Sequence, residues 1–372
     1  MNSIGIGLIG TGFMGKAHAL AFGAVRAVMG DVPDVRLEVL CDTPSDKAAQ
    51  IAAQFGFARA TDDWRDLVSD SRVDIVSITT PNQFHHEMAL AAIAAGKHVY
   101  CEKPLALTLQ QATEMADAAQ KAGVKTMVGY NYIHNPTFTH ACRLIADGAI
   151  GKVIHFRGWV DEDYQANPDL AWTWRSTLAA AGLGALGDMG CHLVSMAYGL
   201  VGPIDSLIAD MQTVHETRPL ADGSGRAKVE NEDIATALVK FAGGFQGSLS
   251  TSRSAWGRKS RLAWEVHGTQ GMLCFDQERM NELRLYQNSG DPAQQGFKTI
   301  LAGPQHPPYG NFCPAPGHQL GFNDLKVIEA ASFLRAIASD TKPYPDFADA
   351  LEFEKVIHAV ADAARGDKRA FV

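Results

Sequence analysis

A glycine-rich turn near the amino terminus constrains the fold more than any other feature of this chain. An unbroken apolar run, Ile4–Ile9, leads into Gly10-Thr11-Gly12-Phe13-Met14-Gly15, and a helical pattern follows at Met14–Val28. Glycines at the first, third and sixth positions permit a tight turn, close approach of a pyrophosphate, and tight packing of helix on strand. A plain glycine-rich turn is the alternative, but the strand–turn–helix setting predicts dinucleotide binding. The residues expected at the cofactor are Gly10, Gly12, Phe13 and Met14.

Short apolar runs alternate with helical patterns through the first third of the chain. Strands are expected at Ile4–Ile9, Arg36–Leu40, Val73–Thr79, His98–Cys101 and Lys125–Gly129, and helices at Met14–Val28, Ser45–Phe55, Trp64–Ser69, Phe84–Ala95 and Leu109–Ala122. Runs rich in Val, Ile and Leu are typical of parallel strands buried on both faces. The alternation therefore predicts an α/β fold whose first domain, residues 1–129, is a doubly wound parallel Rossmann sheet.

The pattern changes near Tyr130, where alternating runs replace the buried ones. After a helix at Thr137–Asp147, strands are expected at Lys152–Val160, Ile204–Val214, Ile234–Phe241, Phe245–Ser252, Arg261–Gly268, Met272–Asp276 and Leu283–Gln287. Gly243-Gly244 is typical of a hairpin turn, and Gly290–Gly317 of a long loop. Helices at Asp324–Ala338 and Ala348–Ala364 end the chain. We expect residues 130–372 to form an α/β domain with a large, mostly antiparallel open sheet, whose free face suits an oligomer.

Length, charge and cysteine usage limit the possible functions. A chain of 372 residues fits two domains. A formal charge of −8 without a Lys/Arg run argues against nucleic-acid binding. No apolar stretch is expected to span a bilayer, and the amino terminus has no signal-peptide pattern. The six cysteines are scattered without a Cys-x-x-Cys pair, which argues against a zinc site or a disulfide framework and favours the cytoplasm.

Two further segments are candidates for cofactor contacts. Asp42 ends the second expected strand, where a carboxylate can bond the ribose hydroxyls and repel a 2′-phosphate. Thr43-Pro44-Ser45 follows it, with no immediate Arg or Lys, which favours NAD over NADP. A capping Asp is the alternative. Thr80-Pro81-Asn82 follows another strand at the expected switch point, where Asn82 could bond the cofactor and His85 could lie over it; a turn and helix start is an equal alternative.

Lys103 is the candidate proton acceptor. It ends the run Val99-Tyr100-Cys101-Glu102-Lys103, and the residue before a proline is held extended, which aims this lysine along the edge of the sheet. Beside a positively charged nicotinamide ring its pKa should fall, which suits proton exchange. A surface lysine paired with Glu102 is the alternative. The position in the fold favours a catalytic role.

A second candidate group lies at Gly187-Asp188-Met189-Gly190-Cys191-His192. Asp188 and His192 are four residues apart and should share one face of a helix, where the carboxylate can orient the imidazole. A capping Asp and a core His remain the alternative. Cys191 beside His192 is compatible with a metal site, but no further cluster of ligands in the sequence supports one. Candidate substrate contacts are Tyr132, Trp159, Trp172, Trp174 and Arg175, for which core packing or an exposed ion pair is the alternative.

Taken together these segments resemble the Gfo/Idh/MocA family of oxidoreductases over nearly the whole chain. The resemblance rests on Gly10–His18, Thr80-Pro81-Asn82, the run Gly96–Val99 to Glu102-Lys103-Pro104, and Gly184–His192. It implies NAD as cofactor, a second domain whose open sheet makes oligomer contacts, commonly in a homotetramer, and catalysis by Lys103, Asp188 and His192. It also places Glu102, Lys103 and Asn131 at the cofactor, and Lys103, Tyr132, Trp174, Arg175, Asp188 and His192 at the substrate.

The branch is similar to inositol, levoglucosan and related cyclic-polyol dehydrogenases, on Tyr130-Asn131-Tyr132, Trp174-Arg175 and Ala255–Arg258. The resemblance implies oxidation of a ring secondary alcohol, with scyllo- or myo-inositol, or a pyranose such as L-glucose, as the expected substrate. Either His192 or Lys103 would take the proton. Many members have an Asp where this chain has Ser195, which affects the choice of polyol. The rival functions are a redox-neutral NAD-dependent glycosidase and a non-catalytic NAD-binding regulator.

Overall fold

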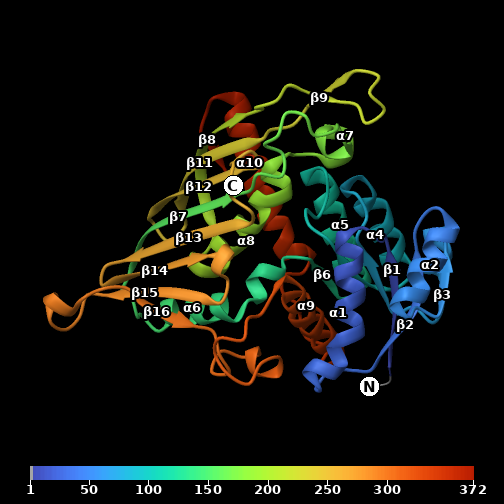
Figure 1. Ribbon diagram of the computed structural model, residues 1–372, viewed down its shortest axis with the longest axis horizontal. Coiled ribbons are helices and arrows are strands. Elements are labelled where there is room, and N and C mark those ends of the chain that lie inside the picture. The colour runs from blue at the N-terminus through green and yellow to red at the C-terminus, as the bar shows by residue number, and fades with distance from the viewer. Residues whose placement is uncertain (1–2) are drawn as a thin grey trace. The chain divides into compact units, whose positions relative to one another are not determined.

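The protein, represented by a computed structural model that describes residues 3–372, divides into two compact units (Figure 1). Of the described residues, the first unit contains 3–134 and 321–352, and the second contains 135–320 and 353–372. The sequence instead placed a single boundary between 129 and 130. The difference arises because a 3₁₀ turn, Asn131–His134, and the late helix α9, Phe322–Ala338, pack within the first unit, where α9 lies beside the first helix.

The first unit is built on a six-stranded parallel sheet with the strand order β3-β2-β1-β4-β5-β6. Its strands are β1 (Ile4–Ile9), β2 (Val35–Cys41), β3 (Arg59–Thr61), β4 (Ile75–Ile78), β5 (His98–Cys101) and β6 (Thr126–Val128). The order reverses between β1 and β4, which is the switch point at which doubly wound sheets bind their ligands. The central strands are buried throughout, in keeping with their continuous apolar runs.

Helices connect these strands, and their ends follow local capping chemistry. They are α1 (Phe13–Met29), α2 (Ser45–Phe55), α3 (Trp64–Ser69), α4 (His85–Ala94) and α5 (Leu109–Ala122). The Thr108 hydroxyl accepts a hydrogen bond from the Gln111 backbone N–H at the start of α5, and Gly123 ends that helix at φ +67°. The sequence missed β3, since its three residues carry too short a pattern to read.

The second unit is built on a nine-stranded sheet in the order β16-β15-β14-β13-β7-β12-β11-β8-β17. Its strands are β7 (Val153–Asp161), β8 (Ile204–Gln212), β11 (Ile234–Phe241), β12 (Gln246–Ser252), β13 (Arg261–Gly268), β14 (Gly271–Asp276), β15 (Glu282–Gln287), β16 (Lys298–Leu301) and β17 (Ala370–Phe371). Every pair is antiparallel except β12 with β7. The expected mostly antiparallel sheet is therefore confirmed.

The Gly243-Gly244 hairpin is also confirmed, since β11 pairs with β12 and the rings of Phe241 and Phe245 stack 4.8 Å apart across the turn. The sequence missed the hairpin β9 (Thr217–Pro219) and β10 (Arg226–Lys228), whose short polar strands lack an apolar face. It also missed β16, which lies inside the expected loop Gly290–Gly317.

Three helices pack against this sheet: α6 (Pro136–Ala146), α8 (Cys191–Val201) and, from Phe353 onward, α10 (Phe347–Gly366). The short helix α7 (Leu178–Ala181) packs against the turn Trp174–Ser176 instead. Tyr198 of α8 and Phe353 of α10 pack ring against ring at 5.3 Å. Contrary to the sequence-based expectation, Leu178–Val201 is long and apolar enough to cross a membrane; 78% of its apolar window is buried inside the protein, as in a core helix.

Candidate functional site

The glycine turn has the backbone geometry that its sequence predicts. Gly10 has φ +96°, a left-handed conformation that favours glycine. A methyl group on Gly15 would collide with the Gly10 carbonyl oxygen, so this position holds α1 against the end of β1. A methyl group on Gly12 would meet nothing within 4 Å. The turn is therefore closed on its protein side and open at Gly12.

The open side of this turn fits a phosphate-bearing cofactor. No side chain caps the start of α1 at Gly12, so the first backbone N–H groups, at the positive end of the helix dipole, are left for an anionic ligand. A second buried polar group in this unit, the Asn131 side-chain amide nitrogen, has no hydrogen-bond partner among residues 3–372. Buried donors rarely stay unpaired. Both observations fit a bound dinucleotide, which supports the expected positions of Gly12 and Asn131 at the cofactor.

Asp42 lies immediately after β2 and is fixed by hydrogen bonds. Its carboxylate accepts bonds from the Thr11 hydroxyl, from the Lys47 ammonium at 2.9 Å and from the Thr43 backbone N–H at 2.6 Å. Burial alone would raise its pKa, but these bonds outweigh burial and lower it. Asp42 is therefore a fixed anion at the end of β2. The capping interpretation is not realised, because Asp42 does not cap α2, which begins after Pro44.

The segment after β4 is tied to the segment after β5 by His85. Its Nδ1 lies 2.9 Å from the Pro104 carbonyl oxygen and its Nε2 lies 3.1 Å from the Thr80 carbonyl oxygen. The imidazole is fully buried, and burial lowers its pKa against the opposing effect of these carbonyls. His85 thus links the Thr80-Pro81-Asn82 turn to the loop that carries Lys103. Its expected contact with the cofactor stays a prediction, as do those of Thr80, Pro81 and Asn82.

Lys103 lies at the carboxyl end of β5, two strands from the glycine turn. It is half-buried, and its backbone N–H lies 3.3 Å from the Glu102 carboxylate as a donor. Glu102 is buried and bonds to His18 and Lys326. It is therefore not the exposed surface carboxylate that the alternative interpretation of Lys103 requires. Ligands of doubly wound sheets bind at this edge.

Aromatic side chains extend from the glycine turn to the expected substrate residues of the first unit. Phe13 is 70% exposed, and its ring packs 5.3 Å from Phe322 at the start of α9. Phe322 in turn meets the Tyr132 ring edge-on at 6.1 Å. Tyr132 is half-buried. Sequence reasoning missed Phe322, which is separated from Tyr132 by almost 200 residues and has no local pattern to mark it.

In the second unit, Asp188 and His192 lie at an irregular point of a helix. Leu186–Gly190 forms a π-helical turn, η4, which continues into α8 at Cys191. The expectation of a regular α-helix is wrong here. Such turns insert one residue into a helix and are common at functional sites. His192 is buried and Asp188 is half-buried. The Ser195 hydroxyl donates to the His192 backbone carbonyl at 2.8 Å, so this side chain is occupied within its own helix.

Tyr164 is a functional candidate that the sequence analysis missed. Its hydroxyl donates a hydrogen bond to Asp188 Oδ2 at 2.7 Å. Burial, followed by the negative charge of Asp188, raises the pKa of this phenol well above its ordinary value, so Tyr164 stays a donor. The residue follows β7 in a loop without regular structure, and only the long-range contact reveals it.

A buried polar network fixes the loop that carries Trp174 and Arg175. Arg253 Nε bonds to Asp233 at 2.6 Å, and its Nη2 donates to the Asn231 side-chain oxygen at 2.9 Å. Asn231 in turn donates to the Arg175 carbonyl oxygen at 2.9 Å. The Arg175 guanidinium is exposed and lies 4.4 Å above the Trp174 ring. The loop backbone is thus held from the sheet, while the half-buried Trp174 ring and the exposed Arg175 guanidinium stack on each other.

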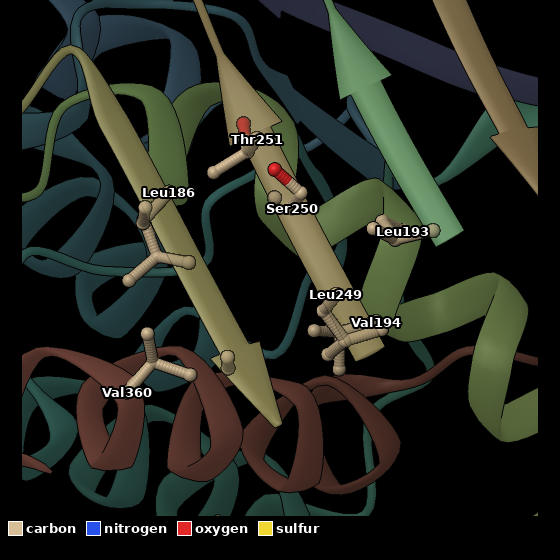
Figure 2. A pocket seen from close by; sticks show the side chains of 10 residues that line it. Leu186, Leu193, Val194, Leu249, Ser250, Thr251 and Val360 are labelled. Atoms are coloured by element: carbon tan, nitrogen blue, oxygen red, sulfur yellow. The ribbon is translucent and has the colours of Figure 1, made fainter. Parts of the chain in front are cut away.

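The second unit contains a small apolar cavity beside η4 and α8. The apolar cavity in Figure 2 is lined by Leu186 of η4, Leu193 and Val194 of α8, residues of β11 and β12, and Val360 of α10. Its volume of about 10 Å³ holds no more than one water molecule. Among residues 3–372 no group of three His, Cys, Asp or Glu side chains could hold a metal ion.

Comparison with known proteins gives matches along the whole chain. Residues 4–130 match the family described as "Oxidoreductase family, NAD-binding Rossmann fold", and residues 138–274 match the "GFO/IDH/MocA C-terminal domain". Levoglucosan dehydrogenase of Pseudarthrobacter phenanthrenivorans is 36% identical over 377 residues, covering 98% of this chain and 97% of that protein. A scyllo-inositol 2-dehydrogenase (NAD(+)) of Bacillus subtilis is 25% identical over 337 residues, covering 90% and 86%. A solved structure of levoglucosan dehydrogenase with NADH and levoglucosan has a TM-score of 0.97 at 36% identity and covers 100% of both chains.

Proposed function

The chain belongs to the GFO/IDH/MocA oxidoreductase family, and we propose that it is an NAD-dependent dehydrogenase of a ring secondary alcohol in a cyclic sugar or polyol. One observation carries the proposal. Lys103, which can accept a proton, follows the β5 strand of an NAD-binding sheet whose glycine turn, Asp42 and Asn131 fit the dinucleotide. The roles of individual residues below are part of this proposal.

The proposed chemistry separates a hydride from a proton. When bound, NAD accepts the hydride from the carbinol carbon. Lys103 accepts a hydrogen bond from the substrate hydroxyl when its amine is neutral and takes the proton as the carbonyl forms. In the second unit, His192 and Asp188 are the alternative acid–base pair, with the His192 imidazole as the alternative proton acceptor. The Tyr164 hydroxyl keeps the Asp188 carboxylate oriented.

The proposed substrate is a pyranose, an anhydropyranose or an inositol. Levoglucosan is the first compound to test, because a levoglucosan dehydrogenase resembles this chain over nearly the full length of both. scyllo-Inositol and L-glucose, the compounds expected from the sequence, are next. Trp174 and Arg175 supply an apolar face and forked donors suited to a ring with vicinal hydroxyls.

A substrate panel tests this proposal most directly. The purified chain is assayed with levoglucosan, inositols and hexoses, with NAD and NADP in parallel, by the accumulation of reduced cofactor. We expect NADH formation with at least one cyclic substrate and weaker use of NADP. Release of a sugar without net NADH would instead identify the redox-neutral glycosidase. NAD binding without turnover of any compound would identify the non-catalytic regulator.

We further propose that the protein is a cytoplasmic homotetramer. All six cysteines are free thiols, which suits a reducing compartment. In the second unit, Leu238 of β11 and Ile208 of β8 are paired across neighbouring strands and are 58% and 39% exposed. A partner's sheet would cover this apolar pair. Replacement of Leu238 by Asp should lower the mass measured by sedimentation; an unchanged tetramer would exclude this face as the interface.

A further inference from the structure

A cluster of ionisable groups is buried inside the first unit, and the proposed chemistry does not use it. His18 of α1, Tyr100 and Glu102 of β5 and its end, and Lys326 and Glu329 of α9 are its members. Each of them is no more than 3% exposed. Burying charges is costly unless they are paired, so a cluster of this kind needs a reason.

Glu102 is the centre of this cluster. Its Oε1 accepts hydrogen bonds from Lys326 Nζ at 2.6 Å and lies 2.8 Å from His18 Nε2. His18 Nδ1 lies 2.8 Å from the Ser77 hydroxyl, which holds the ring from the β4 side. Burial alone would raise the pKa of Glu102, but Lys326 and His18 outweigh it and lower that pKa well below its usual range. Glu102 is therefore a carboxylate anion whose orientation is set by two helices.

The same carboxylate is joined to the peptide that carries Lys103. Its Oε2 accepts from the Lys103 backbone N–H at 3.3 Å. The Glu102 carboxylate also fills the space that a side chain on Gly129 would need, so the chain after β6 closes around it. The carboxylate thus connects α1 and α9 to the residue next in sequence, which is the proposed proton acceptor.

Lys326 is the cation paired with this anion, and the pKa values of the other ionisable groups nearby are shifted toward their neutral forms. Burial, with Lys326 as the next cause, lowers the pKa of His18, so its ring is neutral. Burial and Lys326 also lower the pKa of His134 to about 4. Burial raises the pKa of Glu329, and the Tyr100 hydroxyl donates to this carboxyl. Lys326 Nζ donates to Glu329 at 2.8 Å as well.

We propose that Lys326 is a positioning residue for the catalytic lysine: it compensates the charge of Glu102 and, through Glu102, fixes the peptide and the local field at Lys103. This inference rests on the proposed function, in which Lys103 holds the substrate proton. His85 holds the next residue, Pro104, from the α4 side, so the Lys103 loop is anchored on both sides. Lys326 itself touches neither substrate nor cofactor in this proposal.

Loss of the Lys326 charge has a consequence that a purely structural role would not produce. An uncompensated carboxylate near Lys103 favours the protonated form of that lysine. The acid limb of the pH profile, the range in which kcat/KM falls as pH decreases, should then move to higher pH. A higher pH is needed because the Lys103 ammonium must lose its proton before it can act. Neutralising Glu102 instead should move the limb to lower pH. Opposite shifts from two members of one ion pair identify an electrostatic link to Lys103.

The experiment compares Lys326→Met, Lys326→Arg, Glu102→Gln and Glu329→Gln. For Lys326→Met we expect kcat to fall up to about 100-fold, as for a slightly misplaced catalytic group, with little change in the Kd of NAD. The acid limb should rise by about one pH unit. Lys326→Arg keeps the charge and should return the limb toward the parent value. Glu102→Gln should lower it.

Glu329→Gln is the matched control, because this residue lies in the same cluster and also contacts Lys326. Its Oε1 has no hydrogen-bond partner within residues 3–372, so an amide fits there without loss of a bond. We expect melting temperature to change but the limb to stay in place. A limb that shifts equally in Glu329→Gln, or that stays unmoved in both Lys326→Met and Glu102→Gln, would overturn the positioning role.

A second readout separates this inference from the proposed function. The rate at which an amine-acylating reagent modifies Lys103, measured by peptide mass spectrometry across pH, reports its protonation without any substrate. The midpoint should move upward in Lys326→Met and downward in Glu102→Gln. If the parent oxidises no compound but these midpoints move, the dehydrogenase proposal fails and the link to Lys103 stands. If turnover is normal in the parent and the midpoints do not move in the variants, the positioning role of Lys326 is excluded and the dehydrogenase proposal stands. Should Lys326→Met not fold, Glu102→Gln and Lys326→Arg decide the question by the same two readouts.

Discussion

The two units hold their proposed reactive groups by different means. In the first unit, Lys103 follows directly from a strand end, and a buried ion cluster fixes the adjoining Glu102. In the second, Asp188 lies in a π-helical turn and takes its hydrogen bond from Tyr164, a loop residue. The proposed reactive residue of the first unit is thus marked by a short contiguous motif and supported from distant helices. The proposed pair of the second unit depends on a contact with a loop residue that no motif marks. A common cofactor and variable substrates are compatible with this division.

Removal of the Lys103 amine should have the largest effect. Lys103→Ala is expected to lower turnover by about 10²–10⁴-fold, the usual contribution of a general base. The Kd of NAD, measured by fluorescence titration, should change little, because the glycine turn and Asp42 are untouched. Lys121→Ala, at an exposed position near the end of α5, is the control. Near-normal turnover in Lys103→Ala would place the proton acceptor in the second unit, on His192.

Two glycines of the same turn should respond differently to a methyl group. Gly15→Ala would clash with the Gly10 carbonyl and is expected to lower the free energy of unfolding by about 1–3 kcal/mol. Gly12→Ala meets open space and should keep near-parental stability while weakening NAD binding by about tenfold or more. Chemical denaturation and NAD titration measure the two effects. Equal NAD affinity in Gly12→Ala and the parent would argue against the pyrophosphate lying at this backbone.

The sequence was most informative where a structure is encoded in neighbouring residues. The helices Ser45–Phe55 and Leu109–Ala122 and the strand His98–Cys101 have the predicted ends, because apolar periodicity and the glycines that end both helices are local signals. The return of α9 to the first unit could not be predicted, since it follows from packing against α1 across some 300 residues of chain.

The same distinction applies to the candidate site. The glycine turn, Asp42 and Lys103 were found from motifs whose chemistry is carried by adjacent residues. Tyr164 and Lys326 were not, because a tyrosine in a loop and a lysine in a helix are ordinary until their partners are known. The π-helical form of Leu186–Gly190 was also missed, since its residues have the same apolar pattern as a regular helix.

Tyr164→Phe tests whether the hydrogen bond from Tyr164 to Asp188 in the second unit contributes to turnover, as is proposed for the strand-end residues of the first unit. It removes one hydrogen bond to a carboxylate, with an expected loss of about 10- to 100-fold in kcat/KM. The Kd of NAD should be unaffected. Tyr286→Phe is a matched control, since it removes a 2.7 Å bond to Gln295 elsewhere in the same unit. Similar kinetics in both variants would reduce Tyr164 to a packing role.

Asp42→Ala is expected to have the smallest effect, because it alters cofactor choice rather than chemistry. Loss of the carboxylate removes repulsion of a 2′-phosphate and frees the Lys47 ammonium, now 2.9 Å from Asp42, to bond that phosphate. The ratio of kcat/KM with NAD to kcat/KM with NADP should fall by about tenfold, which corresponds to about 1.4 kcal/mol.

In the parent the preference for NAD should persist as pH falls toward the mildly acidic range, since hydrogen bonds hold the pKa of Asp42 below its ordinary value and keep this carboxylate ionised. Asp46→Ala, in the first turn of α2, controls for a general loss of negative charge. If the ratio is unchanged in Asp42→Ala, cofactor choice does not depend on the end of β2. The first unit, like the second, would then depend on contacts between distant residues that no sequence motif marks.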